Sequence, residues 1–383
     1  MRMEELSTPC YIIDEDKLEE NLNVLKSVME DTGCKILLAQ KAFSAYATYP
    51  LIGKYLCGTT ASGLYEARLG REEMKGSHSA KQMETHIFSA AYRDDEFEQI
   101  AEICDHIVFN SFYQLARFRS LALAKGAGIG LRINPECSTQ EGHAIYDPCA
   151  PGSRLGITSG AFAGQNLDVV EGLHFHTLCE QNSDDLEKTL EAVEEKFGEY
   201  LQLPQIKWLN FGGGHHITRT DYDIDRLKTC IRQMQERYQV QIYLEPGEAV
   251  ALNAGYLVTQ VLDVVKNGEY AIAILDTSAA CHMPDVIEMP YRPPLQDSGE
   301  AGERAYTYRL AGPTCLAGDV IGDYSFDGEL KPGDKLVFED MAIYSMVKNN
   351  TFNGMALPSI VLKTGDECRV WKRFGYEDFK SRL

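Results

Sequence analysis

The chain has 383 residues, enough for two domains, and its 44% hydrophobic and 25% charged content is ordinary for a globular protein. A net charge of −20 argues against nucleic acid and anionic membranes as partners. The negative charge suits a cationic small substrate, although acidity also serves solubility. No apolar run reaches membrane-spanning length, and the N-terminus is too polar for a signal peptide. The 11 cysteines include no C-x-x-C pair, which predicts reduced thiols and a cytoplasmic protein.

The N-terminal region predicts a short strand followed by a helix. Residues 8–13 form an apolar strand pattern, and Asp14 is a reasonable N-cap. The helix carries apolar residues at helical spacing, and Gly33 provides a stop; the apolar residues are Leu18, Leu22, Leu25 and Val28.

An alternation of strands and helices then covers roughly 220 residues. The predicted strands are 35–40, 57–61, 86–89, 107–110, 130–134, 172–176, 208–212 and 242–245. Helical segments between them include 63–75, 111–125, 183–200 and 221–238. Eight such strands fit a (β/α)8 TIM barrel, with an open doubly wound sheet as the alternative. The count of eight favours closure.

The pattern changes after Gly255. The runs 256–265, 271–275, 306–310 and 335–338 are typical of strands, and helical periodicity is scarce. We therefore expect a barrel over residues 14–254 and a C-terminal β domain over 255–383. The β domain is expected to include the N-terminal strand, within residues 1–13.

Lys41 follows a buried strand almost immediately. Desolvation at such a position lowers the pKa of a lysine, which would leave a neutral amine able to form a Schiff base. An ordinary surface lysine is the alternative. In a barrel, function lies at the C-terminal ends of the strands. The later strand ends carry Ser62, Arg132, His176, the glycines Gly212, Gly213 and Gly214, and Glu245.

These groups together suggest pyridoxal phosphate. Its aldehyde needs an amine, its phosphate needs backbone N–H donors, and its ring nitrogen needs an acid. The glycines also have a plain alternative role in turn geometry. His174 and His176 share one face of their strand, so a metal-dependent barrel hydrolase is an outside alternative. No carboxylate or further histidine completes an obvious metal ligand set.

The chain resembles the fold type III (alanine racemase-fold) PLP decarboxylases, which include the ornithine and diaminopimelate enzymes. The resemblance covers nearly the whole length. It implies that Lys41 in LAQKAF holds the cofactor and that His176 stacks on its ring. It further implies that Glu245 pairs with the ring nitrogen and that Gly212–Gly214 bind the phosphate. The other matching residues are Arg132 in LRINPE, Cys315 in GPTCLAGD and Tyr344 near the phosphate.

Departures from the family pattern point to the substrate. The usual E-P-G-R is EPGEA here, so Glu248 replaces an arginine, and Cys179 and Leu316 also differ from the family residues. EPGEA, TCLAGD and CHMPD look most like the branch that decarboxylates carboxynorspermidine or carboxyspermidine. For such a polycationic amino acid we expect Glu248 and Asp285 to bind the distal amines. Solvated carboxylates near turns are the alternative for both residues.

The same resemblance implies that Cys315 comes from a partner subunit and protonates the substrate Cα, within a homodimer that shares its active sites. A buried structural thiol is the alternative. A racemase would need a second base, and a diaminopimelate decarboxylase would want a cation where Glu248 stands. Diaminopimelate or another basic amino acid is nevertheless the alternative substrate.

Overall fold

The computed structural model describes residues 2–75, 83–140 and 144–383. It divides into two compact units. One, here called the barrel unit, comprises residues 21–250, and the other, the sheet unit, comprises 1–20 with 251–383. Helix α1 (Glu15–Thr32) contributes to both, and the four apolar residues predicted for its inner face are fully buried. No helix in the described ranges combines the length and apolar character needed to cross a membrane.

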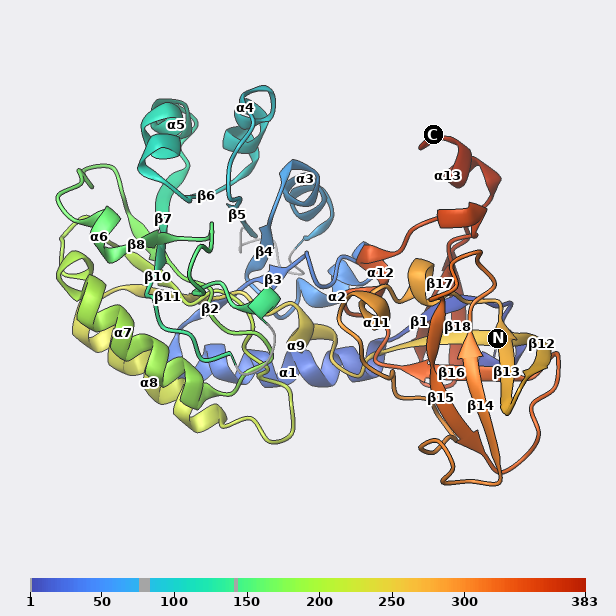
Figure 1. Ribbon diagram of the computed structural model, residues 1–383. Coiled ribbons are helices and arrows are strands. Elements are labelled where there is room, and N and C mark those ends of the chain that lie inside the picture. Colours follow the sequence, from blue (N-terminus) through green and yellow to red (C-terminus); the bar gives the residue numbers. More distant parts are fainter. Residues whose placement is uncertain (1, 76–82, 141–143) are drawn as a thin grey trace. The chain divides into compact units, whose positions relative to one another are not determined.

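The barrel unit is built on a parallel sheet, whose strands are labelled in Figure 1. Its strands are β2 (Lys35–Ile36), β3 (Leu38–Ala39), β4 (Gly58–Ala61), β5 (Glu84–Phe88), β6 (His106–Phe109), β7 (Gly128–Asn134), β9 (Gly172–His174), β10 (Trp208–Asn210) and β11 (Gln241–Leu244). A short strand, β8 (Ile157–Thr158), pairs with β7.

Closure depends on the segment 35–39, which contains both β2 and β3. β2 pairs with β11, and β3 pairs with β4. Between them, Leu37 N–H donates to Leu244 O at 2.9 Å and Cys57 N–H donates to Ile36 O at 2.9 Å. The segment therefore joins the first and last parts of the sheet. The predicted (β/α)8 barrel is confirmed, and the open doubly wound sheet is wrong.

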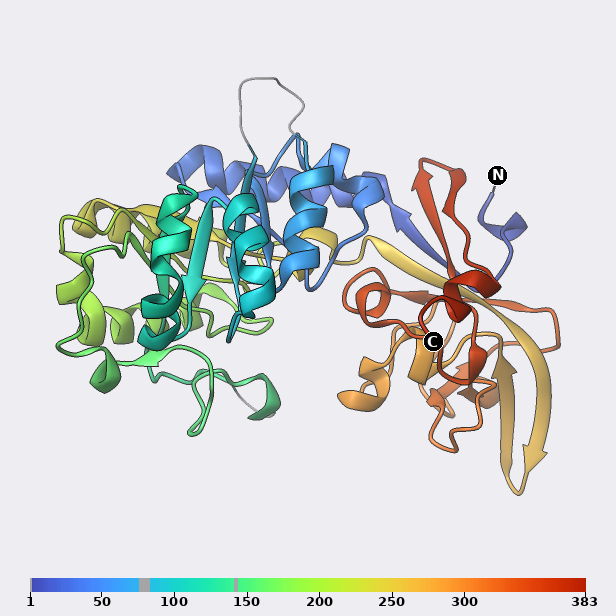
Figure 2. The same ribbon diagram turned by 90° about the horizontal axis from the view of Figure 1, so that it is seen from above.

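Helices follow the strands on the outside of the barrel. They include α3 (Leu64–Glu73), α4 (Asp94–Ile103), α5 (Phe112–Ala124), α7 (Ser183–Leu201) and α8 (Ile224–Tyr238). Side chains cap the starts of α5 and α8, since Ser111 accepts from Gln114 N–H and Asp223 accepts from Arg226 N–H. Figure 2 shows α3, α4 and α5 side by side. Short helices α2 (Tyr49–Ile52), α6 (Ser159–Phe162) and α9 (Glu248–Ala251) complete the unit.

Trp208 fills the barrel interior, where two glycines make room for it. A Cβ on Gly172 would lie 2.0 Å from the Trp208 ring, and one on Gly130 would lie 2.3 Å from it. The indole stacks on His106 with 4.8 Å between ring centroids. Both glycines are therefore needed for packing, because no side chain fits between strand and indole.

The sheet unit is mostly β. Its strands are β1 (Cys10–Asp14), β12 (Gly255–Asn267), β13 (Tyr270–Leu275), β14 (Tyr306–Ala311), β15 (Val320–Phe326), β16 (Lys335–Glu339), β17 (Ser359–Thr364) and β18 (Glu367–Lys372). The order is β15-β14-β13-β12-β1-β17-β18, and β16 also pairs with β12. β1 lies antiparallel to β12 and parallel to β17, so the N-terminal strand is part of this sheet, as expected. The sequence patterns did not reveal β15, β17 or β18.

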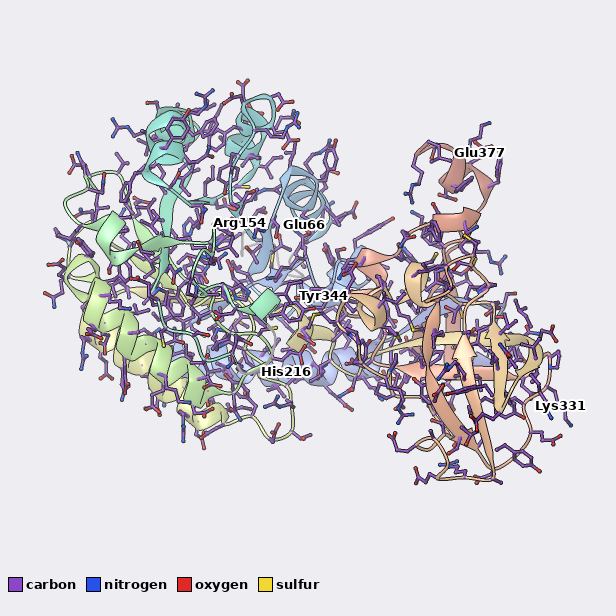
Figure 3. All side chains as sticks on the ribbon, viewed as in Figure 1. Glu66, Arg154, His216, Lys331, Tyr344 and Glu377 are labelled. Atoms are coloured by element: carbon purple, nitrogen blue, oxygen red, sulfur yellow. The ribbon has the colours of Figure 1, made fainter. Side chains whose placement is uncertain are left out.

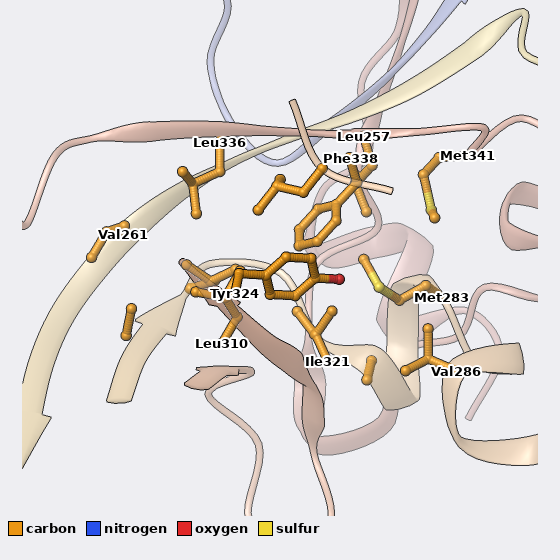
Figure 4. Close-up of a cluster of buried hydrophobic side chains, with 14 of the residues drawn as sticks. Leu257, Val261, Met283, Val286, Leu310, Ile321, Tyr324, Leu336, Phe338 and Met341 are labelled. Carbon is orange, nitrogen blue, oxygen red and sulfur yellow. The ribbon is translucent and has the colours of Figure 1, made fainter. Parts of the chain in front are cut away.

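One face of this sheet packs on an apolar core around Tyr324 and Phe338 (Figure 4). Both side chains are fully buried. Tyr324 OH donates to Pro293 O at 2.7 Å, which satisfies the polar end of an otherwise apolar ring. The unit also contains the short helices α10 (Ala279–His282), α11 (Asp285–Glu288), α12 (Ser345–Lys348) and α13 (Tyr376–Lys380).

Candidate active site

The C-terminal ends of the barrel strands surround one pocket. Five of the predicted residues line it, namely Lys41, Arg132, His176, Gly213 and Glu245. The remaining lining residues are Ala39, Thr60, Ala61, Ser62, Phe88 and His174. Because parallel strands all point the same way in a closed barrel, residues far apart in the sequence converge at this end.

Lys41 presents its amine to the centre of this group. Its Nζ lies 3.2 Å from His176 Nε2. The side chain keeps accessible surface because it faces the pocket, yet the barrel around the pocket withdraws much of its hydration. The pKa of Lys41 is lowered by this desolvation first and by the positive charge of Arg132 second. The negative charge of Glu245 has the opposite, smaller effect. The direction is the one that a reactive lysine amine requires.

Glu245 is the buried acid of the pocket. Its Oε1 accepts from Asn210 Nδ2 at 2.8 Å, and its Oε2 lies 3.2 Å from His174 Nε2. Burial by itself raises the pKa of Glu245, but His174 and Asn210 outweigh burial and hold it at about 2. The carboxylate is therefore ionised at neutral pH and remains able to accept a further proton donor.

Arg132 and His176 form a neighbouring pair. Arg132 Nη2 donates to His176 O at 3.0 Å, and the guanidinium lies 4.5 Å from the Phe88 ring centroid. Burial lowers the pKa of Arg132 to about 10, so the group stays charged at neutral pH. Burial, followed by the charges of Lys41 and Arg132, holds the pKa of His176 well below its usual range. The imidazole is consequently neutral and can lie flat against an aromatic ring.

The three glycines after β10 are required by close backbone packing. A Cβ on Gly212 would lie 2.3 Å from Phe175 O, and one on Gly214 would lie 1.9 Å from Leu178 O. Both residues also have positive φ, at 69° and 81°. Gly212 N–H already donates to Asn210 Oδ1 at 2.8 Å, and Gly213 N lies 3.0 Å from His176 Nδ1. The turn geometry that was the plain alternative thus accounts for these residues, and an anion would have to compete for two of the three N–H groups.

Two carboxylates that do not line the pocket act on groups at this end of the barrel. Glu66, marked in Figure 3, accepts from Ser62 N–H at 2.6 Å and lies in electrostatic range of Lys41. Burial raises the pKa of Glu66. Glu248 begins α9 and is half-buried. The pKa of the Cys179 thiol is raised to about 11, first by burial and then by the negative charges of Glu180 and Glu248. Glu248 is therefore close enough to Cys179, the residue that replaces the family serine, for its charge to be felt there.

The sheet unit holds the other three predicted residues. Cys315 is exposed, and its backbone N–H donates to Asn353 Oδ1 at 3.0 Å, so the alternative of a buried structural thiol is wrong for this chain. Tyr344 (Figure 3) precedes α12 with φ of 54°, an uncommon conformation for a residue with a side chain. Asp285 begins α11 and is ion-paired with Lys348, which also pairs with Glu288.

The sequence patterns missed Asn210, Phe88 and Glu66. Asn210 ends β10, directly before the glycine turn, so the rule that functional groups lie at strand ends could have revealed it. Phe88 ends β5, and its ring stacks on His174 with 5.5 Å between centroids. Glu66 is the acidic residue in the first turn of α3. Among the described residues, no three His, Cys, Asp or Glu side chains gather as a metal site.

Comparisons with known proteins define the class. The family model described as "Pyridoxal-dependent decarboxylase, C-terminal sheet domain" matches residues 10–342. The chain therefore belongs to the pyridoxal-dependent decarboxylases.

Individual members of this class are similar to the chain over its whole length. A carboxynorspermidine/carboxyspermidine decarboxylase of Campylobacter jejuni is 43% identical, over 100% of both chains. A carboxyaminopropylagmatine decarboxylase of Synechocystis is 40% identical, over 100% of this chain and 97% of that protein. The crystal structure of carboxynorspermidine decarboxylase complexed with norspermidine from Campylobacter jejuni matches with a TM-score of 0.90. It is 43% identical and covers 99% of this chain and 100% of that one.

The hydrogen bonds to Glu245 predict a specific acid sensitivity. Since the carboxyl has a lower pKa in the folded chain than its ordinary 4.5, the unfolded chain takes up the proton first on acidification. The stabilisation is present above pH 4.5 and is lost as the pH falls toward about 2, a loss of up to about 3 kcal/mol. We expect Glu245→Gln to abolish this part of the pH dependence.

The measurement is urea unfolding of the cofactor-free protein from pH 5 to pH 2. The exposed Glu195 of α7 supplies the matched control, Glu195→Gln. Parallel curves for wild type and Glu245→Gln over this range would contradict the assignment.

Proposed function

We propose that this chain is a PLP-dependent carboxy-lyase that converts carboxynorspermidine and carboxyspermidine to norspermidine and spermidine. The observation that carries the proposal is the pocket of Lys41, His176 and Glu245 in a chain 43% identical, over its whole length, to an enzyme with that name. Pyridoxal phosphate, when bound, supplies an electron sink for the carbanion formed at the substrate Cα.

The residues present fit this cofactor. Lys41 offers a primary amine whose pKa is lowered, and Glu245 offers an ionised acid for the protonated ring nitrogen. His176 is a neutral ring at the same pocket, suited to stack on the pyridine face. Gly214 extends the backbone cradle after β10. We assign the phosphate to Gly212–Gly214 and Tyr344, with Arg132 supplying positive charge near the ring.

Each side chain then has a defined task. Lys41 would hold the cofactor through its amine. Glu245 would keep the ring nitrogen protonated, because a carboxylate ionised at neutral pH stabilises a cation beside it. His176 and Phe88, which line the same pocket, would pack against the cofactor. Cys315 donates its thiol proton to the substrate Cα after carbon dioxide has left, and the thiolate regains a proton from water.

The substrate is proposed to be polycationic because two carboxylates, Glu66 and Glu248, act on residues in and beside the barrel pocket. Glu248 stands where the family carries arginine, and Glu66 adds a second carboxylate in range of Lys41. Our assignment of Asp285 is weakened by its ion pair, since Lys348 already neutralises it. A distal ammonium would have to displace that lysine. Because Glu248 replaces the cation of the family motif, we place the distal-amine contact first on Glu248.

Carboxyaminopropylagmatine is the second candidate substrate, because a decarboxylase of that name is 40% identical over this whole chain. It carries a guanidinium where the others end in an ammonium. The planar guanidinium can donate two parallel hydrogen bonds to one carboxylate, whereas an ammonium binds as a point charge. Diaminopimelate, with a second carboxylate, is disfavoured by Glu248.

The first prediction concerns Lys41. The purified protein should be yellow, and borohydride should bleach the visible band and leave a reduced pyridoxyl group on the Lys41 peptide. Lys41→Ala should lack the visible band. Its kcat should fall at least about 1,000-fold, because the covalent step disappears. Lys54→Ala is the control, an exposed lysine elsewhere in the barrel unit. A colourless, metal-containing wild type would overturn the proposal.

The second prediction concerns Glu248. Glu248→Gln should raise KM for carboxynorspermidine about tenfold, with little change in kcat, because it removes one charge attraction of about 1.4 kcal/mol. Glu180→Gln is the matched control, an exposed acid beside Cys179. The assay panel is carboxynorspermidine, carboxyspermidine, carboxyaminopropylagmatine, meso-diaminopimelate and ornithine. An unchanged KM for every polyamine precursor would remove Glu248 from the substrate site.

The third prediction concerns assembly. We propose a homodimer whose barrel units carry the cofactor and whose sheet units carry Cys315 for the partner's site. Lys41→Ala and Cys315→Ala should each be nearly inactive, yet a co-expressed mixture should recover about a quarter of wild-type activity. Half of randomly paired dimers are mixed, and each mixed dimer has one intact site. A mixture no more active than its parts would contradict shared sites.

A further inference from the structure

The loop that carries Cys315, residues 312–319, ends on a buried carboxylate. Asp319 is 3% exposed. Its Oδ2 accepts from Thr314 Oγ1 at 2.7 Å and from Ser278 Oγ at 2.9 Å. Its Oδ1 accepts from Ala279 N–H at 2.8 Å, with a longer contact from Ala280 N–H at 3.4 Å. Thr314 N–H makes a longer contact to Oδ2, at 3.3 Å. One side chain thus joins the cysteine loop to the start of α10.

Every partner of this carboxylate is a neutral donor. Among the described residues, its hydrogen-bond donors include no lysine, arginine or histidine, although His282 senses its charge without a hydrogen bond to it. A buried charge without a counter-ion is tolerated only where hydrogen bonds replace its hydration. An asparagine would keep one oxygen for Ala279 N–H, but it would lose the charge, and its NH2 group would face Thr314 N–H and could bind the two hydroxyls only after they turned to accept. An acid therefore suits this set of donors better than the matching amide.

The backbone on both sides of Cys315 is fixed. Thr314, immediately before it, is bound to Asp319, and Cys315 N–H itself donates to Asn353 Oδ1 at 3.0 Å. The loop is also closed on itself, since Gly312 N–H donates to Asp319 O and Asp319 N–H donates to Leu316 O, each at 2.9 Å. A Cβ on Gly312 would lie 2.2 Å from Asp319 Oδ2, so the glycine is needed for the carboxylate to reach its position.

We infer that Asp319 is the positioning residue for Cys315: its buried carboxylate clamps Thr314 to the start of α10 and so holds the thiol where it delivers its proton to the substrate Cα. The inference rests on the role given to Cys315 in the proposed function. In that step the S–H bond breaks and the Cα–H bond forms, and the thiolate is reprotonated by water. With a misplaced thiol, the proton would be added to the cofactor carbon instead of the substrate Cα. Water would then release the substrate carbon as an aldehyde and leave its amino nitrogen on the cofactor, so that aldehyde would form instead of amine.

The test compares Asp319→Asn, Thr314→Val and Thr314→Ser in the holoenzyme. Thr314→Val removes the hydroxyl donor at nearly constant shape, whereas Thr314→Ser retains it. Asp276→Asn is the matched control, because Asp276 accepts from Thr259 Oγ1 and Gln260 N–H in the same unit and has no hydrogen bond to residues 312–319 among those described. Cys315→Ala reports on the function of the thiol itself.

Two readouts are needed. Hydrogen exchange of the peptide covering residues 312–319 should rise on the order of tenfold in Asp319→Asn and Thr314→Val. In the same variants kcat should fall about 10- to 100-fold with little change in KM, and the ratio of aldehyde to amine product should rise. Thr314→Ser and Asp276→Asn should match wild type in both. A role confined to stability would lower the melting temperature and leave the product ratio unchanged.

The outcomes are separable. If loop exchange stays at the wild-type rate in both Asp319→Asn and Thr314→Val, Asp319 does not hold the loop and the inference is wrong. It is equally wrong if exchange rises while kcat and the product ratio stay unchanged, provided that Cys315→Ala alters them. If Cys315→Ala itself keeps the wild-type ratio, the failure lies in the proposed role of Cys315. Thr314→Val keeps the test decisive should Asp319→Asn fail to fold.

Discussion

The structure depends on bringing an amine, a guanidinium and a carboxylate into one desolvated pocket. Lys41 and Arg132 repel each other there, and Glu245 opposes both charges. Desolvation and Arg132 lower the pKa of Lys41, while His174 and Asn210 keep Glu245 ionised. Neither group would have these properties on an open surface, because water would screen the charges and restore the ordinary pKa values.

Barrel closure makes this arrangement possible. The segment 35–39 pairs with β11 on one side and with β4 on the other, and Lys41 follows it directly. Glycines allow the close backbone approaches that closure demands, under Trp208 in the interior and after β10 at the pocket. The same glycines are thus explained by packing before any ligand is considered. A phosphate site there would exploit a turn that the barrel already needs.

The sheet unit uses a different device to hold a functional group. Its core around Tyr324 and Phe338 supports the sheet, but the cysteine loop lies at an exposed edge. Apolar burial cannot fix such a loop, so a hydrogen-bonded carboxylate does so instead. Asp319 and Glu245 are alike in one respect: each is a buried acid held by hydrogen bonds from the surrounding residues.

The sequence alone predicted the barrel, the N-terminal strand in the sheet unit, and a set of residues that the folded barrel brings together at one pocket. These features depend on local patterns: apolar runs, helical spacing and the polar groups that follow strands. The patterns missed β15, β17 and β18, where alternation is broken by glycine, aspartate and lysine. Only the tertiary structure decided that His174 and Asn210 bind Glu245, that Lys348 neutralises Asp285, and that Asp319 anchors the cysteine loop. Those contacts join residues 35 to 71 positions apart, except within the loop itself, and a chain pattern carries no information on which distant donor a buried carboxylate will meet.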